Sequence, residues 1–164
     1  MPANRTISIF RNRLALLGFV VFCLAVGFAA GQLTAPNIAS WYNGLAKPSF
    51  NPPNGVFAPV WTVLYLLMAV AAWRVWRKTG WRSAALALWL AQLVLNLAWS
   101  LVFFGLHAPL PAFVELIALW LTLTATVLVF ARIDRTAGWL LAPYWAWASF
   151  AGVLNFWVWR LNPG

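Results

Sequence analysis

The stretch from Leu14 to Leu33 reads LALLGFVVFCLAVGFAAGQL and contains no charged residue. A helix of about 20 residues spans about 30 Å, the thickness of the hydrocarbon core of a bilayer. Hydrocarbon offers no partner to an unpaired backbone group, so such a run is expected to be helical. The stretch therefore predicts a transmembrane α-helix. The basic residues before it and the small residues Ala29 and Ala30 also fit a cleaved signal peptide, although the apolar run is long for one.

Four more apolar stretches follow, at about residues 56–73, 84–106, 112–131 and 139–159. The whole chain is 64% hydrophobic and 8% charged, whereas a soluble domain carries about 25% charged residues. So few charges cannot cover a water-facing surface. The alternating segments of about 10 residues that are typical of a membrane β-barrel are absent. The sequence predicts an all-α fold, a single membrane domain over residues 1–164 built as a bundle of five transmembrane helices.

The formal net charge of +9 predicts orientation rather than nucleic-acid binding, because the basic residues lie in short segments between apolar runs. With five spans, nine Lys and Arg fall on the side of the N-terminus and two on the other. Cytoplasmic segments carry the excess of positive charge. We therefore expect a cytoplasmic N-terminus, an external C-terminus and, for a bacterial chain, the inner membrane. The nine are Arg5, Arg11, Arg13, Arg74, Arg77, Lys78, Arg82, Arg132 and Arg135, and the two are Lys47 and Arg160.

The connection between the first two predicted helices is the longest, and reads TAPNIASWYNGLAKPSFNPPNG from Thr34 to Gly55. Proline at positions 36, 48, 52 and 53 is expected to prevent a regular helix through it. Trp41, Tyr42 and Phe50 distinguish it from a plain solvated linker. Long loops of this kind are often functional lids, so we predict a lid over residues 34–55.

Polar and aromatic side chains recur at helical spacing within the apolar runs, which places them on shared faces. Intramembrane polar groups usually face the bundle interior or a cavity, so these faces predict a site for a flat, mostly apolar ligand. Amides that join helices and aromatic rings that anchor at the interface are the alternative interpretation. The faces comprise Trp61 with Tyr65, then Gln92 with Asn96, Trp99 and Phe103, then Trp147 with Ala151, Leu154 and Asn155.

No metal site or cofactor is predicted, since Cys23, His107, Glu115 and Asp134 are scattered without ligand spacing. Two helix surfaces made of small residues could form an interface between copies of the chain. One is the GxxxG pattern of Gly27 and Gly31, and the other is a set of small residues on the third apolar run. Such surfaces let helices approach closely. They suit a homodimer, which we predict, and equally close packing within one chain. The second set is Ala84, Ala87 and Ala91.

Taken together, the motifs from about Ser40 to Asn162 resemble the TspO/MBR family, which comprises bacterial tryptophan-rich sensory proteins and the mitochondrial translocator protein, or peripheral-type benzodiazepine receptor. The joint pattern carries the resemblance, since no single motif is specific. The matching stretches are Trp41-Tyr42, Leu45 to Pro53, Val56 to Thr62 with Leu64-Tyr65, Gln92-Leu93 with Leu95-Asn96, Ala98-Trp99, Phe103 to Gly105, Pro143-Tyr144 with Trp147, Leu154 to Phe156, and Trp159-Arg160.

This resemblance implies a five-helix bundle that binds porphyrins such as protoporphyrin IX, sterol-like lipids and benzodiazepine-site ligands. It implies a role in sensing, transport or disposal of porphyrins. The alternatives are light-dependent porphyrin degradation, with Trp61 and Trp147 as the catalytic pair, transport of another apolar metabolite, or a structural role in a larger membrane complex. Phe156 stands where animal members carry the tyrosine of a proposed cholesterol motif. The implied binding residues are Tyr42, Pro52, Trp61, Asn96, Trp99, Trp147, Ala151, Leu154 and Asn155. We add Tyr65 to the predicted ligand-binding residues because it is the i+4 neighbour of Trp61.

Overall fold

The computed structural model of the chain describes the backbone of residues 3–163 and the side chains from residue 11 onward. Within that range every regular element is helical and no strand occurs, which confirms the all-α prediction. The five α-helices are α1 (Ala3–Ser40), α2 (Asn54–Thr79), α3 (Ala84–Ser100), α4 (Pro109–Ile133) and α5 (Arg135–Leu161). Two short helices join them, the 3-10 helix η1 (Tyr42–Gly44) and the π-helix η2 (Leu101–Gly105).

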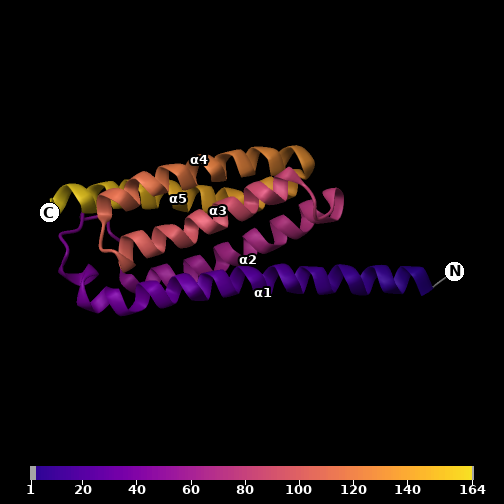
Figure 1. Cartoon of the computed structure of the whole chain (residues 1–164), viewed down its shortest axis with the longest axis horizontal. Helices are drawn as coiled ribbons and strands as arrows, with labels where there is room; N and C mark the ends of the chain where they lie inside the picture. The colour runs from indigo at the N-terminus through magenta and orange to yellow at the C-terminus, as the bar shows by residue number, and fades with distance from the viewer. Residues whose placement is uncertain (1–2, 164) are drawn as a thin grey trace.

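The helices run roughly along one long axis, and the two termini lie at opposite ends of the bundle (Figure 1). α4 packs along α5, α1 along α2, and α3 along α4. α1, drawn in indigo to purple, extends past the ends of the other helices at its N-terminal side (Figure 1). Since 38 residues make a helix about 57 Å long, α1 is longer than a bilayer core is thick.

The prediction of an irregular segment from residue 34 to residue 55 is wrong at its start. α1 continues through Pro36 to Ser40, so the irregular segment covers only residues 41–53. Two side chains donate hydrogen bonds to backbone carbonyls around the proline, Thr34 Oγ1 to Ala30 O at 2.9 Å and Asn37 Nδ2 to Leu33 O at 3.0 Å. Neither bond reaches Gln32 O, the carbonyl that loses its helical donor at Pro36, but both reinforce the helix in the adjoining turns.

α2, α4 and α5 also run beyond the predicted bounds, because hydrophobic patterning detects only their apolar centres, whereas α3 with η2 stays within the predicted 84–106. α2 carries Arg77 and Lys78 in its last turn. α5 begins at Arg135, where the Asp134 side chain accepts a hydrogen bond from the Ala137 N–H as an N-cap. At the end of α3, the Leu106 N–H donates to Leu101 O at 2.9 Å, five residues back, which is π-helical spacing.

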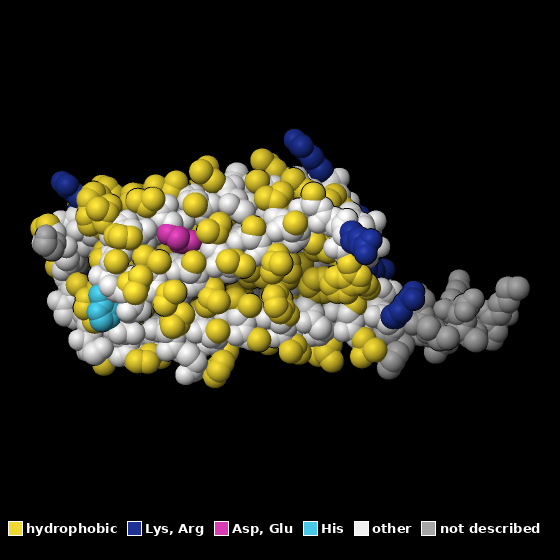
Figure 2. All heavy atoms as spheres, viewed as in Figure 1, with side chains coloured by type: hydrophobic (Ala, Val, Ile, Leu, Met, Phe, Trp, Pro, Cys, Tyr) yellow, Lys and Arg dark blue, Asp and Glu magenta, His cyan; other side chains and the backbone are white. Residues whose placement is uncertain are grey.

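In the part of the chain that the structure describes, four helical segments are long and apolar enough to cross a membrane: Arg11–Ser40, Asn54–Thr79, Ala84–Gly105 and Pro109–Ile133. The chain is therefore a multi-pass membrane protein. α5 has 27 residues and is as long as these, but five tryptophans, Asn155 and its terminal arginines lower its mean hydropathy. Figure 2 shows hydrophobic side chains over the visible face and Lys and Arg side chains near the ends, mainly the end where α1 begins.

Candidate functional site

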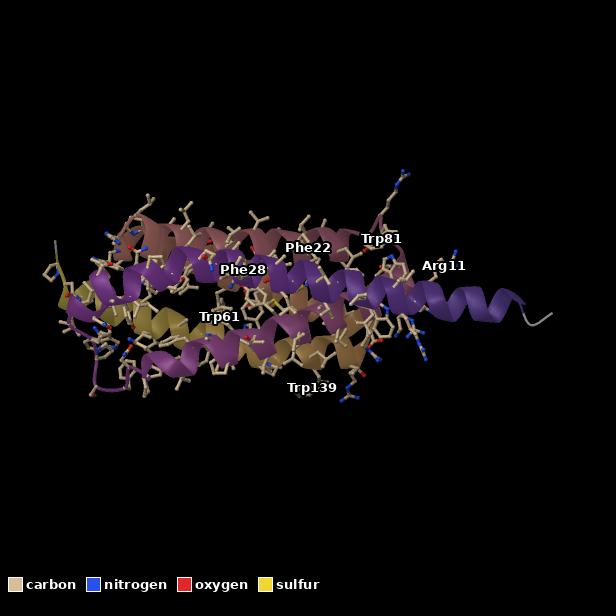
Figure 3. The ribbon with its side chains drawn as sticks, turned by 90° about the horizontal axis from the view of Figure 1, so that it is seen from below. Arg11, Phe22, Phe28, Trp61, Trp81 and Trp139 are labelled. Atoms are coloured by element: carbon tan, nitrogen blue, oxygen red, sulfur yellow. The ribbon has the colours of Figure 1, made fainter. Side chains whose placement is uncertain are left out.

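A cavity of about 450 Å³ lies between α1, α2, α3 and α5, next to η1. Its volume falls within the range of about 300–1,000 Å³ that small-molecule sites occupy. The lining is formed largely by aromatic rings, small residues and aliphatic side chains, and it contains no charged residue. Figure 3 shows Trp61 of α2 in the space between α1 and α2, near Phe28 on α1. The site is therefore an apolar pocket built inside the bundle.

Most of the predicted site residues meet at this cavity, although they come from four separate segments. Asn96 and Pro52 do not line it. Asn96 is buried behind its wall, and Pro52 lies in the irregular segment before α2. The eight that line it are Tyr42, Trp61, Tyr65, Trp99, Trp147, Ala151, Leu154 and Asn155. The shared faces at helical spacing therefore located the cavity, but did not separate its lining from the layer behind it.

Asn96 supports the cavity from behind by joining two tyrosines. The Tyr65 hydroxyl donates to Asn96 Oδ1, and Asn96 Nδ2 donates to the Tyr144 hydroxyl at 3.1 Å. All three side chains are at most 3% exposed. The Trp61 ring packs against both phenols, with centroid distances of 5.8 Å to Tyr65 and 5.9 Å to Tyr144. The position of Trp61 in the cavity therefore depends on a buried polar chain.

Asn155 lines the cavity, but its amide is already engaged. Trp99 Nε1 donates to Asn155 Oδ1 at 3.0 Å, and Asn155 Nδ2 donates to Pro109 O at 2.8 Å. The Trp99 ring, held by this bond, stacks on Phe103 at 5.1 Å. Asn155 thus ties α5 to the start of α4 and orients an aromatic wall. Its amide keeps one donor hydrogen and one acceptor lone pair beyond these two bonds.

The remaining polar side chains of the lining are mostly engaged as well. The hydroxyls of Thr34 and Thr62 bond to carbonyls one turn earlier, and Asn54 Nδ2 donates to Asn43 Oδ1 at 3.0 Å. With no charged side chain in its lining, the cavity offers mainly shape and apolar area. The titratable side chains of the lining are the phenols of Tyr42 and Tyr65, and each hydroxyl donates a hydrogen bond to an asparagine of the same chain.

Residues 41–53, which we call the lid segment, adjoin one end of the cavity, its outer end, where Tyr42 is part of the lining. Lys47 organises it from within, because its Nζ donates to Tyr42 O at 2.7 Å and Leu45 O at 2.8 Å and lies 4.8 Å from the Tyr42 ring centre. The Tyr42 hydroxyl donates to Asn51 Oδ1 at 2.8 Å. Burial raises the pKa of Tyr42, and its bond to Asn51 offsets that only in part, so the phenol stays a neutral donor.

The side of the cavity between α1 and α2 reaches the outer surface of the bundle. Phe28 lines the cavity and is nevertheless 69% exposed. Gly31 and Ala35 on α1, and Ala58 on α2, are also both lining and exposed. This side faces the bilayer in a membrane-spanning bundle, so the pocket is bounded by the lid segment at one end and by hydrocarbon at one side.

Several lining residues were not predicted from the sequence. Phe57 lies one turn before Trp61, and Val158 lies one turn after Leu154, so helical spacing could have found both. Gly27 and Gly31 were interpreted only as a packing motif. Both line the cavity, and Gly27 also contacts the Tyr65 ring of the same chain, which supports the packing-within-one-chain interpretation for that residue.

Comparison with known proteins gives consistent matches along most of the chain. The family model described as the TspO/MBR family matches residues 19–160. The chain is 47% identical to the tryptophan-rich protein TspO of Chlorobaculum tepidum over 86% of its length and 91% of that protein. It is 40% identical to the TspO of Archaeoglobus fulgidus, over 92% of the chain and 99% of that protein. It is 36% identical to the translocator protein of Sus scrofa, over 92% of each. The chain belongs to the TspO/MBR family.

Proposed function

We propose that this protein binds porphyrins and related flat, apolar ligands in the cavity between α1, α2, α3 and α5. The observation that supports this proposal is the cavity itself, which has a volume of about 450 Å³, aromatic walls and no charged residue in its lining. A porphyrin offers two large apolar faces, which stack on aromatic rings, and carboxylates at one edge. That edge would point toward the lid segment and toward Asn54, the first residue of α2 and part of the lining.

The proposed role of binding is sensing, transport or disposal of porphyrins. Membership of the family supports a small-molecule role, and one relative is named a tryptophan-rich sensory protein and others translocator protein. Sterol-like lipids and benzodiazepine-site ligands are proposed as further occupants of the same cavity, because its lining selects by shape and apolar area rather than by charge.

Titration with protoporphyrin IX tests the proposal directly. Tryptophan fluorescence of the purified protein should be quenched with a Kd of about 1 μM or tighter, about −8 kcal/mol. Ala151→Leu fills part of the cavity and should weaken binding at least roughly tenfold. Ala118→Leu is the matched control, since Ala118 is an exposed α4 residue outside the lining. Equal affinity in the parent and both variants would contradict binding in this cavity.

A second candidate function is light-dependent breakdown of the bound porphyrin. Its basis is that two oxidisable indoles, Trp61 and Trp147, line the same cavity. Phenylalanine keeps an aromatic wall but is much harder to oxidise. Trp61→Phe and Trp147→Phe should therefore bind protoporphyrin IX within about 1 kcal/mol of the parent, yet bleach it more slowly under light in the presence of dioxygen. A parent that bleaches porphyrin no faster than detergent micelles alone would exclude this function and leave binding untouched.

A further inference from the structure

The lid segment is joined to the far end of the chain by one asparagine. Asn162 follows directly after α5 and lies 116 residues from Ala46. The Ala46 N–H donates to Asn162 Oδ1 at 2.9 Å, and Asn162 Nδ2 donates back to Ala46 O at 2.9 Å. The side-chain amide thus pairs with both polar groups of one lid residue, as a neighbouring strand would.

The same amide also holds on to α5. Asn162 Nδ2 donates its second hydrogen to Val158 O at 2.7 Å, and the Asn162 N–H donates to Trp159 O at 3.3 Å. Val158 is itself part of the cavity lining. One side chain therefore connects a lid residue to the turn of α5 that lines the pocket.

Among the described side chains, which are those of residues 11–163, no other hydrogen bond connects the lid segment to α3, α4 or α5. The remaining bonds of the lid segment are internal, as with Lys47 and Tyr42, or reach the adjoining ends of α1 and α2. Aromatic contacts add apolar packing, for example Phe50 on Phe150 at 6.3 Å. Ring contacts tolerate sliding, whereas a reciprocal pair of hydrogen bonds specifies one register.

From this geometry we propose that Asn162 is a positioning residue that holds the lid segment closed over the outer end of the cavity and sets how long a ligand stays bound. The residence-time part rests on the proposed binding function. Asparagine is specific here because the site needs two donor hydrogens and one acceptor from a short side chain. Aspartate has almost the same shape but no donor, and it would place a negative charge against Ala46 O.

The test compares Asn162→Ala and Asn162→Asp with the parent, all as full-length protein in lipid nanodiscs. Leu161→Ala is the matched control, because Leu161 is an exposed neighbour at the same end of α5 with no bond to the lid segment. Hydrogen exchange at the Ala46 amide should be at least tenfold faster in both Asn162 variants and unchanged in the control. Helix content should stay the same in all four proteins.

Dissociation of protoporphyrin IX, followed by stopped flow, should be roughly tenfold faster in both Asn162 variants. The association rate should change less than twofold, since affinity changes fall mostly in the off-rate. Unchanged exchange at Ala46 would show that Asn162 does not hold the lid segment. Faster exchange with an unchanged off-rate would overturn the residence-time role. It would indicate that the ligand leaves through the side of the cavity between α1 and α2. A parent that binds no protoporphyrin IX would contradict the proposed function, while exchange at Ala46 still decides whether Asn162 holds the lid segment.

Discussion

Single residues decide how closely the cavity walls approach, and Gly27 is the clearest case. A Cβ on Gly27 would lie 2.6 Å from Cδ2 and 2.7 Å from Cε2 of Tyr65. The ring cannot move away freely, because Tyr65 is buried and its hydroxyl is bonded to Asn96. Gly31, one turn later, has open space where its Cβ would be. The two glycines of one GxxxG pattern therefore have different roles.

We predict that Gly27→Ala lowers the free energy of unfolding by roughly 1–3 kcal/mol, as overpacking a tight contact does. Gly31→Ala should leave it unchanged or raise it by up to about 1 kcal/mol, since alanine is the better helix former. Thermal unfolding in detergent measures both. Equal effects of the two substitutions would contradict the contact between α1 and Tyr65.

The buried amide of Asn96 gives a second prediction at this scale. Asn96→Ala removes the partner of both the Tyr65 and the Tyr144 hydroxyl, and each buried hydroxyl without a partner costs about 1–3 kcal/mol. We expect a loss of stability together with weaker ligand binding, because Trp61 rests on both phenols. Adding Tyr65→Phe to Asn96→Ala should restore part of the stability. A double variant no more stable than Asn96→Ala would show that the phenol does not depend on Asn96.

Between elements, Asp134 joins α2 to the turn between α4 and α5. Its carboxylate accepts hydrogen bonds from Arg74 Nε at 3.2 Å and Nη2 at 3.0 Å, and from the Ala137 N–H at 3.0 Å, and it forms an ion pair with Lys78 at 3.0 Å. Burial alone would raise the pKa of Asp134, but the hydrogen bonds from Lys78, the Ala137 N–H and Arg74 lower it to about 2. The charged carboxylate is thus the form that the fold requires.

This lowered pKa predicts a specific loss of stability in acid. An unfolded aspartate has a pKa of about 3.9, so the contribution of Asp134 is complete above that pH and is lost as pH falls toward about 2. At pH 7, Asp134→Asn should lower the free energy of unfolding by roughly 2 kcal/mol, from charge-assisted bonds. The difference between parent and variant should shrink between pH 4 and pH 2. A constant difference over that range would contradict an ionised Asp134 in the fold.

At the scale of the whole molecule, the distribution of basic residues and the direction of the chain are consistent with the same membrane orientation. The N- and C-termini lie at opposite ends of the bundle (Figure 1), as an odd number of crossings requires. Eight of the basic residues, from Arg11 to Arg135, belong to the end where α1 begins, whereas Lys47 and Arg160 belong to the other end. Arg5 completes the group of nine that the sequence assigns to this end, but its side chain lies outside the side chains that the structure describes. We propose that α5 is the fifth span and that the basic end is cytoplasmic.

Topology is therefore predicted to be N-terminus inside and C-terminus outside. Alkaline phosphatase fused after Gly164 should be active, and a green fluorescent protein at the same place should stay dark. The same pair of fusions within residues 80–82, between α2 and α3, should give the reverse result. A fluorescent C-terminal fusion would contradict both the fifth span and the orientation.

Assembly is also a property of the whole molecule, and the homodimer stays a prediction. Gly27 contacts Tyr65 within one chain. The small residues Ala84, Ala87 and Ala91 instead form an exposed strip on α3. A second copy could approach closely along that strip. Of the two smooth surfaces in the sequence, the one on α3 is the candidate for an interface between copies.

The sequence by itself determined the class of the molecule and the faces that meet inside it. Long uncharged runs can be satisfied only as helices in hydrocarbon, so the helices were predictable, although their ends were not. Helical spacing put Trp61 with Tyr65, and Trp147 with Ala151 and Asn155, on single faces, and these faces do line the cavity. Local periodicity was sufficient for these features because each depends on residues within a few turns of one another.

Only the tertiary structure decided which side chains have partners. Asn96 is bonded to tyrosines 31 and 48 residues away, and Asn155 to a tryptophan 56 residues away, partners that their positions in the sequence did not reveal. Ala46 and Asn162 meet across 116 residues. Pro36 stayed helical where the local rule predicted a break. A hydrogen bond between distant segments depends on how the helices pack together, and periodicity along one helix carries no information about that packing.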